Sequence, residues 1–364
     1  MEKNPKAWQN ELGNYIQRAY REGKGQSKKN ARQQPGGGKH LVHSKNTMQA
    51  YEQNAREFAD FLYSQGITDV LKIKPAHSQA FIQSRIDKGL SAFTINQKRE
   101  AIVKLQESVA AKVGFKVKMM SQEEIATLMK AAGKIRHADP SHANRKSGAI
   151  ITSDEAGRIR KALASSRSPN AAIASTLARF QEASGGRIAA SLRLQVGDIS
   201  PDGHTVKFEN DKGGKTRVIS VDDETAAQFR ALIQGKKAGA PVFVFRDQRG
   251  EIMSIEKAGK SYHRLVKNAR EKAGVVREVG AQATSHSFRK VYTNELMQRV
   301  QAAPLEKIIE GAKMLAKNKA FRDRLNKETG GAITSVNRWK AEQLIVSHSL
   351  GHNRRDVLTF YLQK

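Results

Sequence analysis

Residues 286–289 read His-Ser-Phe-Arg, which places a histidine and an arginine three residues apart on one face of a predicted helix. Upstream, Ser184-Gly-Gly-Arg187 ends one predicted helix and opens another. Between them, Asn210-Asp-Lys-Gly-Gly-Lys215 is rich in residues that tolerate a positive φ and is typical of a hairpin turn. Downstream, Leu350-Gly-His352 is followed nine residues later by Tyr361. Each segment is common by itself, so the information lies in their order along one chain.

The chain is strongly basic. Its 364 residues include 64 Lys and Arg against 35 Asp and Glu, a formal net charge of +29. Such an excess indicates a polyanionic partner, because cations that neutralise phosphates release counterions and so drive binding to nucleic acid. The absence of cysteine excludes disulfides, thiolate metal sites and cysteine nucleophiles. With no apolar signal segment and no apolar run of about 20 residues, we expect a soluble, cytoplasmic, nucleoid-associated protein without a membrane partner.

The pattern predicts a mostly α protein with a small β-sheet (α+β), divided into four parts. Residues 1–42 are expected to form an N-terminal helix, near 6–22, and a basic flexible arm. A helical domain follows at 43–115, then a linker at 116–150 with a short helix near 121–133. Residues 151–364 form the last domain, with a helical insertion near 301–345.

Caps and periodicity predict the individual elements. The helical domain is expected to contain three helices: one capped by Asn46 or Thr47, one at 76–88 and one at 94–113. Thr152-Ser-Asp-Glu155 has the spacing of a capping box and opens a helix at 153–165, which is followed by another at 171–184. The strand candidates are Thr205–Glu209, Arg217–Val221 and Val242–Phe245, and the chain beyond Ser254 reads as helical.

The four segments resemble the tyrosine recombinase (phage integrase) family in their order and near its spacing. The resemblance covers residues 43–115 and 150–364. It implies a core-type DNA-binding domain and a catalytic domain that together form a clamp around DNA. The catalytic residues that it implies are Arg187, Lys212, His286, Arg289, His352 and Tyr361.

The chemistry of phosphodiester cleavage explains this combination. Arginines stay charged at any relevant pH and fork onto phosphate oxygens, a role that fits Arg187 and Arg289. His286 and His352 are expected to donate hydrogen bonds to the phosphate or to assist proton transfer. Tyr361 would attack phosphorus and remain attached to the 3′ phosphate. The phosphotyrosine keeps the bond energy, so we expect neither a cofactor nor a metal.

Two assignments have local rivals. By resemblance, Lys212 gives a proton to the leaving 5′ oxygen, but Lys215 lies in the same turn. Tyr292 competes with Tyr361 as nucleophile, although the family pattern places the nucleophile after Gly-His.

The expected partner is double-stranded DNA with specific recombination sites, bound by a homotetramer with accessory DNA-bending proteins. The predicted helix at 94–113 is apolar on one face and carries Lys98, Arg99 and Lys104 on another, so these residues, with Lys215, are candidate DNA contacts.

Three features depart from the family. Ala190 stands where members often have an acidic residue three positions after the first arginine, which leaves open how Arg187 or His286 is oriented. The connection from Arg289 to His352 is long, and only three residues follow Tyr361. We therefore hypothesise that the 301–345 insertion, or the N-terminal helix, supplies protomer contacts.

The predicted activity is strand exchange between two short sites through a 3′-phosphotyrosine intermediate and a Holliday junction. Integration or excision of a mobile element is the expected setting. The alternatives are a type IB-like topoisomerase, a telomere resolvase, and a DNA-binding regulator that has lost catalysis.

Overall fold

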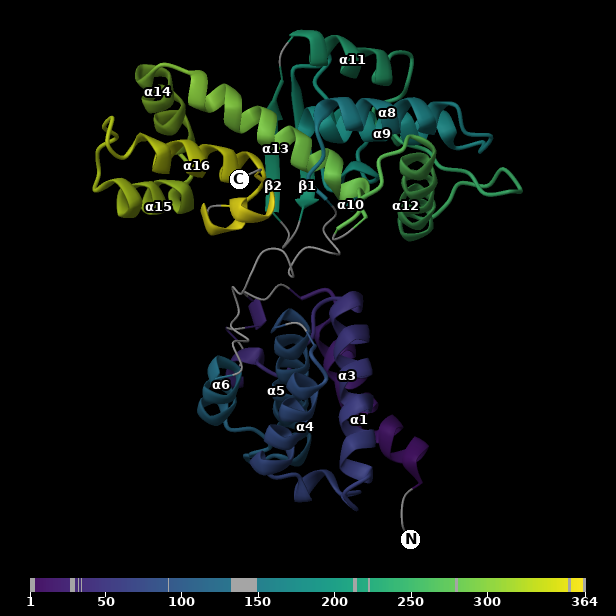
Figure 1. The fold of residues 1–364 in the computed structure, drawn as a ribbon, viewed down its shortest axis with the longest axis vertical. Helices are drawn as coiled ribbons and strands as arrows, with labels where there is room; N and C mark the ends of the chain where they lie inside the picture. The colour runs from purple at the N-terminus through teal and green to yellow at the C-terminus, as the bar shows by residue number, and fades with distance from the viewer. Residues whose placement is uncertain are drawn as a thin grey trace. The chain divides into compact units, whose positions relative to one another are not determined.

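A computed structural model describes residues 4–26, 30–31, 33, 35–90, 92–131, 149–211, 215–221, 223–278, 281–352 and 355–362. The chain divides into two compact units, Met1–Ala143 and Asn144–Lys364. Both are built mainly from helices, and the second also contains one two-stranded sheet (Figure 1). The predicted fold class is thereby confirmed.

The first unit packs its helices around one apolar core. Its elements are α1 (Pro5–Gly23), η1 (Pro35–Gly38), α3 (Lys45–Tyr63), η2 (Val70–Lys72), α4 (Pro75–Asp87), α5 (Ala92–Val113) and α6 (Gln122–Ala131). Trp8 and Leu12 of α1 are fully buried in the same cluster as Phe58 of α3 and Leu105 of α5. The apolar face of α1 is therefore used within its own unit. The four-part division of the chain stays a prediction.

The start of α3 differs from the expected cap. Ser44, and not Asn46 or Thr47, is the N-cap, and its hydroxyl accepts a hydrogen bond from the Thr47 amide at 3.2 Å. The helix therefore begins earlier than apolar spacing alone indicated, because the capping hydroxyl lies just ahead of the periodic stretch.

The second unit is larger. Its elements are α8 (Ser153–Ala164), α9 (Ala171–Ser184), α10 (Ile188–Ser191), η3 (Val196–Asp198), β1 (Thr205–Asp211), β2 (Lys215–Ser220), α11 (Asp223–Ile233), α12 (Ile255–Lys272), α13 (Ser285–Ala302), α14 (Leu305–Leu315), α15 (Lys319–Thr329), α16 (Arg338–Ser349) and η4 (Arg355–Phe360). The predicted capping box is confirmed, since the Glu155 amide donates to Thr152 Oγ1 at 3.1 Å and the Thr152 amide to Glu155 Oε2 at 3.0 Å.

The sheet is a single antiparallel hairpin. β1 pairs with β2 so that Thr205 faces Ser220 and Phe208 faces Arg217, with an irregularity before Asp211. The third strand candidate, residues 242–245, is wrong. This segment is buried, but only its flanks form isolated bridges, at Pro241 and Arg246. A short apolar run can be buried like a strand and still not pair along its length with another strand.

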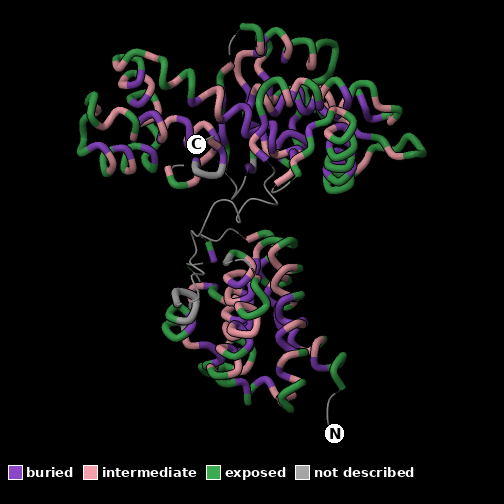
Figure 2. The backbone as a smooth tube through the Cα atoms, viewed as in Figure 1, coloured by how far each residue is buried: buried purple, intermediate pink, exposed green. Residues whose placement is uncertain are grey.

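Helix α13 organises the second unit. It contacts α9 on one side and α16 on another, and Figure 1 shows it running between these parts of the unit. Phe180, Phe208 and Phe288 belong to the main core, while Phe321 and Leu344 belong to a separate small core of α14–α16. Figure 2 shows the buried positions concentrated on the inner faces of the helices. Within the described residues no helix has the length and apolarity needed to cross a membrane.

Candidate active site

The Gly-Gly turn delivers Arg187 to the site. Helix α9 ends at Ser184, and Gly185 takes the left-handed conformation with φ 59°. A Cβ on Gly185 would lie 2.5 Å from Cδ1 of Tyr292 on α13, and a Cβ on Gly186 would lie 2.4 Å from Ser191 Oγ. Glycine is therefore required twice, first by the turn and then by the close approach of neighbouring atoms. Arg187 follows as the N-cap of α10.

Helix α13 supplies the histidine and the second arginine. Thr284 caps it, since its hydroxyl accepts a hydrogen bond from the His286 amide at 3.2 Å. Arg289 is fully buried, and its Nη2 donates to the Leu350 carbonyl at 2.6 Å while its Nη1 donates to the Gly185 carbonyl. The side chain thereby joins the C-terminal ends of α9 and α16, where carbonyl groups favour a cation.

The end of α16 brings in the remaining side chains. Gly351 has φ 75°, and a Cβ there would lie 3.5 Å from Arg217 Cδ and from Asp211 Oδ2. His352 follows, with its Nε2 3.1 Å from Arg187 Nη2. η4 then carries the chain to Tyr361, whose ring centroid lies 5.7 Å from the Arg289 guanidinium.

The two arginines converge on one point. Arg187 Nη2 donates to the Leu350 carbonyl oxygen at 3.3 Å, and Arg289 Nη2 donates to the same atom at 2.6 Å. The Tyr361 ring centroid lies 5.6 Å from that of His286 and 6.5 Å from that of His352. The folded chain thus gathers every predicted catalytic residue that is described.

Lys212 lies outside the described residues. Lys215 is the first residue of β2, and its side chain is not described. The strands on either side of their turn do reach the site, through Asp211 and Arg217.

Arg217 and Asp211 are site residues that sequence reasoning missed. Arg217 Nη1 donates to the carbonyls of Ser349, at 2.6 Å, and Ser184, at 3.2 Å. Its guanidinium also lies over the Phe208 ring, 4.3 Å from the centroid. The available signal was their position at the two ends of the hairpin turn, but a polar residue beside a turn is usually solvated.

Burial and positive charge shape the electrostatics. Burial, then Arg289, Lys290 and Arg187, lower the pKa of His286 to about 3. Burial and repulsion from Arg289 lower the pKa of Arg217 to about 9. The site is therefore built to receive negative charge.

Tyr292 is a poor rival for Tyr361. Burial alone does not separate the two tyrosines, since 6% of the Tyr292 surface and 9% of the Tyr361 surface are exposed. The Tyr292 ring packs against Gly185, whereas the Tyr361 ring lies beside those of His286 and His352. Burial raises the pKa of Tyr292. These observations favour Tyr361 as nucleophile, an assignment that stays a proposal.

Comparison with known families decides the classification. Residues 149–309 match the phage integrase family, and residues 40–112 match the phage integrase N-terminal SAM-like domain. The chain belongs to the tyrosine recombinase family. It is therefore an enzyme of the class that cleaves and rejoins DNA. The catalytic-domain match includes Arg187, His286 and Arg289, whereas His352 and Tyr361 lie beyond it.

Individual relatives of this recombinase are distant. The tyrosine recombinase XerC of Mesorhizobium japonicum is 24% identical over 266 residues, which cover 70% of this chain and 78% of that protein. Among solved structures, the Tn1549 transposon integrase in complex with circular intermediate DNA has TM-score 0.51 at 14% identity, covering 88% of this chain and 90% of that one. A lambda integrase dimer bound to a COC′ core site has TM-score 0.51 at 15% identity, with 87% and 88% covered. These likenesses show a shared fold.

The basic helix α5 of this recombinase differs from expectation. Lys98 is buried, with 4% of its surface exposed, and its ammonium donates to Asn54 Oδ1 at 3.0 Å and to Glu57. It therefore presents no free charge to DNA, and its candidacy as a contact is withdrawn. Arg99 is paired with Glu100, and Lys104 with Glu107.

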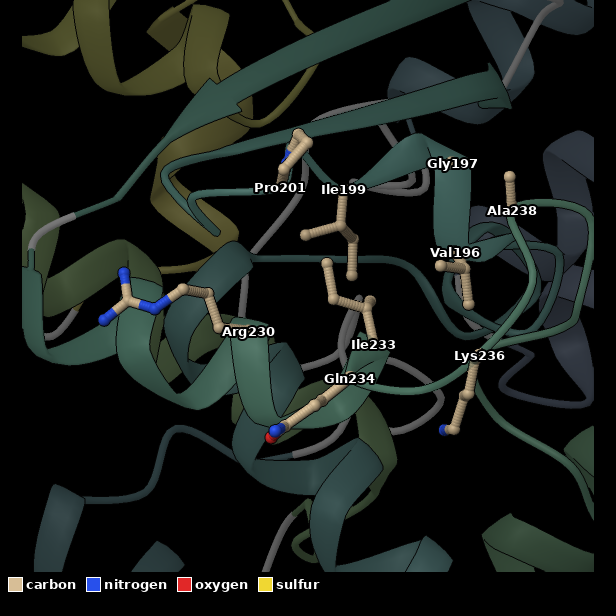
Figure 3. A pocket seen from close by; sticks show the side chains of 9 residues that line it. All are labelled: Val196, Gly197, Ile199, Pro201, Arg230, Ile233, Gln234, Lys236 and Ala238. Carbon is tan, nitrogen blue, oxygen red and sulfur yellow. The ribbon is translucent and has the colours of Figure 1, made fainter.

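A surface cavity of about 660 Å³ lies elsewhere on the second unit. In Figure 3, Ile199 and Ile233 point toward each other inside it, while Arg230 and Lys236 extend outward. None of its lining residues belongs to the arginine, histidine and tyrosine group. Among the described residues, no three His, Asp or Glu side chains are grouped so as to hold a metal.

Proposed function

We propose that this recombinase carries out strand exchange between two short DNA sites, with Tyr361 as nucleophile. One observation carries the assignment. Arg187 and Arg289 converge on a single acceptor, the Leu350 carbonyl, while the Arg289 guanidinium lies 5.7 Å from the centroid of the Tyr361 ring. Two fixed guanidinium groups beside a tyrosine hydroxyl are what in-line attack on a phosphodiester requires.

In the first step, Tyr361 Oη forms a bond to phosphorus as the bond from phosphorus to the 5′ oxygen breaks. Arg187 and Arg289 stabilise the charge that builds on the non-bridging oxygens. His286 and His352 donate hydrogen bonds to the phosphate or assist removal of the tyrosine proton. Lys212, with Lys215 as local rival, protonates the departing 5′ oxygen.

In the second step, a 5′ hydroxyl attacks the phosphotyrosine and expels Tyr361. Each step exchanges one phosphoester for another, so the bond energy is conserved through the covalent intermediate. If the attacking hydroxyl comes from a second duplex, strands are exchanged and a Holliday junction forms. This requires two duplexes held together, for which we propose a tetramer, with DNA-bending proteins as accessory partners.

The proposed setting is integration or excision of a mobile element. Two helices support it: α15, which lies beyond the phage integrase match and between Arg289 and His352, and α1, which lies ahead of the SAM-like match. The specific DNA sites that the protein recognises would then lie next to its gene.

A covalent adduct tests the chemistry. A nicked duplex carrying the DNA that flanks the gene is expected to trap the wild-type protein on a 3′ phosphate, and Tyr361→Phe is expected to abolish trapping. Tyr292→Phe, which removes only a buried hydroxyl, is the matched control and should still form the adduct. Absence of any wild-type adduct would favour a binding-only regulator, and relaxation of supercoiled plasmids without the site would favour a topoisomerase.

A further inference from the structure

We propose that Asp211 is a positioning residue for cleavage, which holds the Arg187 guanidinium in the orientation that binds the scissile phosphate. This inference rests on the proposed function, because it takes Arg187 as a phosphate ligand. It also addresses a departure from the family: Ala190 stands where members often have an acidic residue, and Asp211 would supply a carboxylate in its place.

Asp211 is a buried carboxylate between two arginines. Only 3% of its surface is exposed, and its Oδ2 accepts a hydrogen bond from Arg187 Nη1. The same oxygen lies 3.6 Å from Arg217 Nε. A buried carboxylate with these neighbours offsets a local excess of positive charge, to which Arg289 also contributes.

The contact with Asp211 uses only one terminal nitrogen of Arg187, so the other can face a phosphate. Nη1 is held by Asp211, while Nη2 faces the Leu350 carbonyl and His352. A planar guanidinium fixed at one corner has its remaining N–H directions fixed too. Asp211 therefore sets the angle at which Arg187 meets an oxyanion.

The fold explains why this carboxylate comes from the hairpin. Helix α10, which begins after Arg187, packs on β1. Ala190 of α10 is buried and brings no charge, whereas Asp211 at the end of β1 reaches the arginine from the facing element. Asp211 also directly precedes Lys212. The carboxylate consequently links the proposed phosphate-binding arginine to the strand that ends one residue before the proposed proton donor.

Arg217 links Asp211 to the ends of two helices. It contacts Asp211 through Nε and the carbonyls of Ser184 and Ser349 through Nη1. These carbonyls stand at the ends of α9 and α16, next to Gly185 and Leu350. One network thus fixes the hairpin, the Arg187 turn and the segment that leads to His352.

The test compares Asp211→Asn with Glu209→Gln in the full-length protein. Glu209 lies on the same strand and loses the same charge, but its side chain is 54% exposed and pairs with Lys207. The probe is the nicked flanking-DNA duplex, with single-turnover cleavage and DNA affinity measured separately. Asp211→Asn is expected to slow cleavage about 10- to 100-fold with DNA affinity within about threefold of wild type, because misplacing a catalytic group costs rate on that scale. Glu209→Gln should match wild type in both.

Coupling separates positioning from general loss of structure. In an Arg187→Lys background, Asp211→Asn should add little further loss, because both changes remove one interaction. Equal losses in both backgrounds, or wild-type cleavage by Asp211→Asn, would overturn the proposal. If Asp211→Asn does not fold, Asp211→Glu decides: slowed cleavage by folded protein supports the role, and unchanged cleavage rejects it. A wild type that forms no adduct would reject the proposed function instead.

Discussion

His286 is largely buried in the folded protein, next to several positively charged side chains. Arg187, Arg289, Lys290 and His263 all act with burial to lower its pKa to about 3. The unfolded chain, with a histidine pKa near 6.5, binds more protons at this position between about pH 3 and pH 6.5. The contribution of His286 to folding stability is therefore fully present above pH 6.5 and is lost as the pH falls through this range.

Replacing His286 by Gln should flatten that dependence. At pH 5 the unfolded wild type gains about 2 kcal/mol from this proton, because pH 5 lies about 1.5 units below the unfolded pKa. Thermal or urea unfolding at pH 7.5 and pH 5 measures the difference. His204→Gln is the control, since its carboxylate neighbours raise the pKa of His204 and its loss should not flatten the curve. An unchanged slope for His286→Gln would contradict the prediction.

Lys212 and Lys215 are separable by leaving-group chemistry. If Lys212 is the proton donor, Lys212→Ala should slow cleavage of an ordinary phosphodiester about 100-fold or more. A bridging sulfur in place of the 5′ oxygen should restore the rate, because a thiolate, with a pKa near 8.5, leaves without a proton. Lys215→Ala should show neither effect. The reverse pattern would assign the role to Lys215.

At the scale of elements, η4 is held by the helices that the long connection adds. Arg355 at its start donates to Glu328 of α15 at 2.8 Å and to Gln343 of α16 at 3.3 Å. Its guanidinium lies 4.6 Å from the Trp339 ring centroid. The segment that ends in Tyr361 is thus fixed from upstream.

Loosening this contact should affect the tyrosine. Glu328→Gln keeps every positive charge but weakens a partly buried ion pair, so we expect cleavage to slow by about 3- to 10-fold. DNA affinity should stay unchanged. Arg322→Ala, on the exposed face of the same helix, is the control. Equal cleavage by Glu328→Gln and wild type in a single-turnover assay would show that α15 does not position η4.

The whole molecule consists of two units with separate cores. Trp8 and Phe58 lie in the core of the first, and Phe180 and Phe288 in that of the second. Residues 1–143 and 144–364, expressed separately, should each unfold cooperatively, because each buries its own core. Circular dichroism should place each midpoint within about 5 °C of a transition in the full chain, since about 1 kcal/mol of lost contact shifts a midpoint by that much. A non-cooperative 144–364 fragment would contradict this.

Protomer contacts belong to the same scale. The small core of α14–α16 joins Ile308 and Phe321 to Leu344 of α16. Deleting the 301–345 insertion would therefore expose part of α16, so loss of assembly after such a deletion would not prove a protomer contact. The hypothesis that this region contacts another protomer stays a proposal.

Local signals in the sequence determined the elements and the order of the catalytic motifs. The capping box at Thr152 and the left-handed helix end at Gly185 depend on the conformation of a few consecutive residues, so both can be recognised in the sequence. The Ser44 cap, which the sequence prediction missed, lies only two residues before Asn46 and three before Thr47, the two caps that were expected.

Tertiary structure alone decided which charges meet. Asp211 joined the site through a partner 24 residues away, and Arg217 through a carbonyl 132 residues away. Lys98 was removed from the candidate DNA contacts because its buried ammonium pairs with Glu57, 41 residues distant in the sequence. Residues 242–245 did not form a strand, because the residues on either side make only isolated bridges, at Pro241 and Arg246, and no continuous ladder. Periodicity shows which face of a single helix or strand is apolar. Ion pairing, burial and strand pairing also depend on which distant residues the fold brings next to that element.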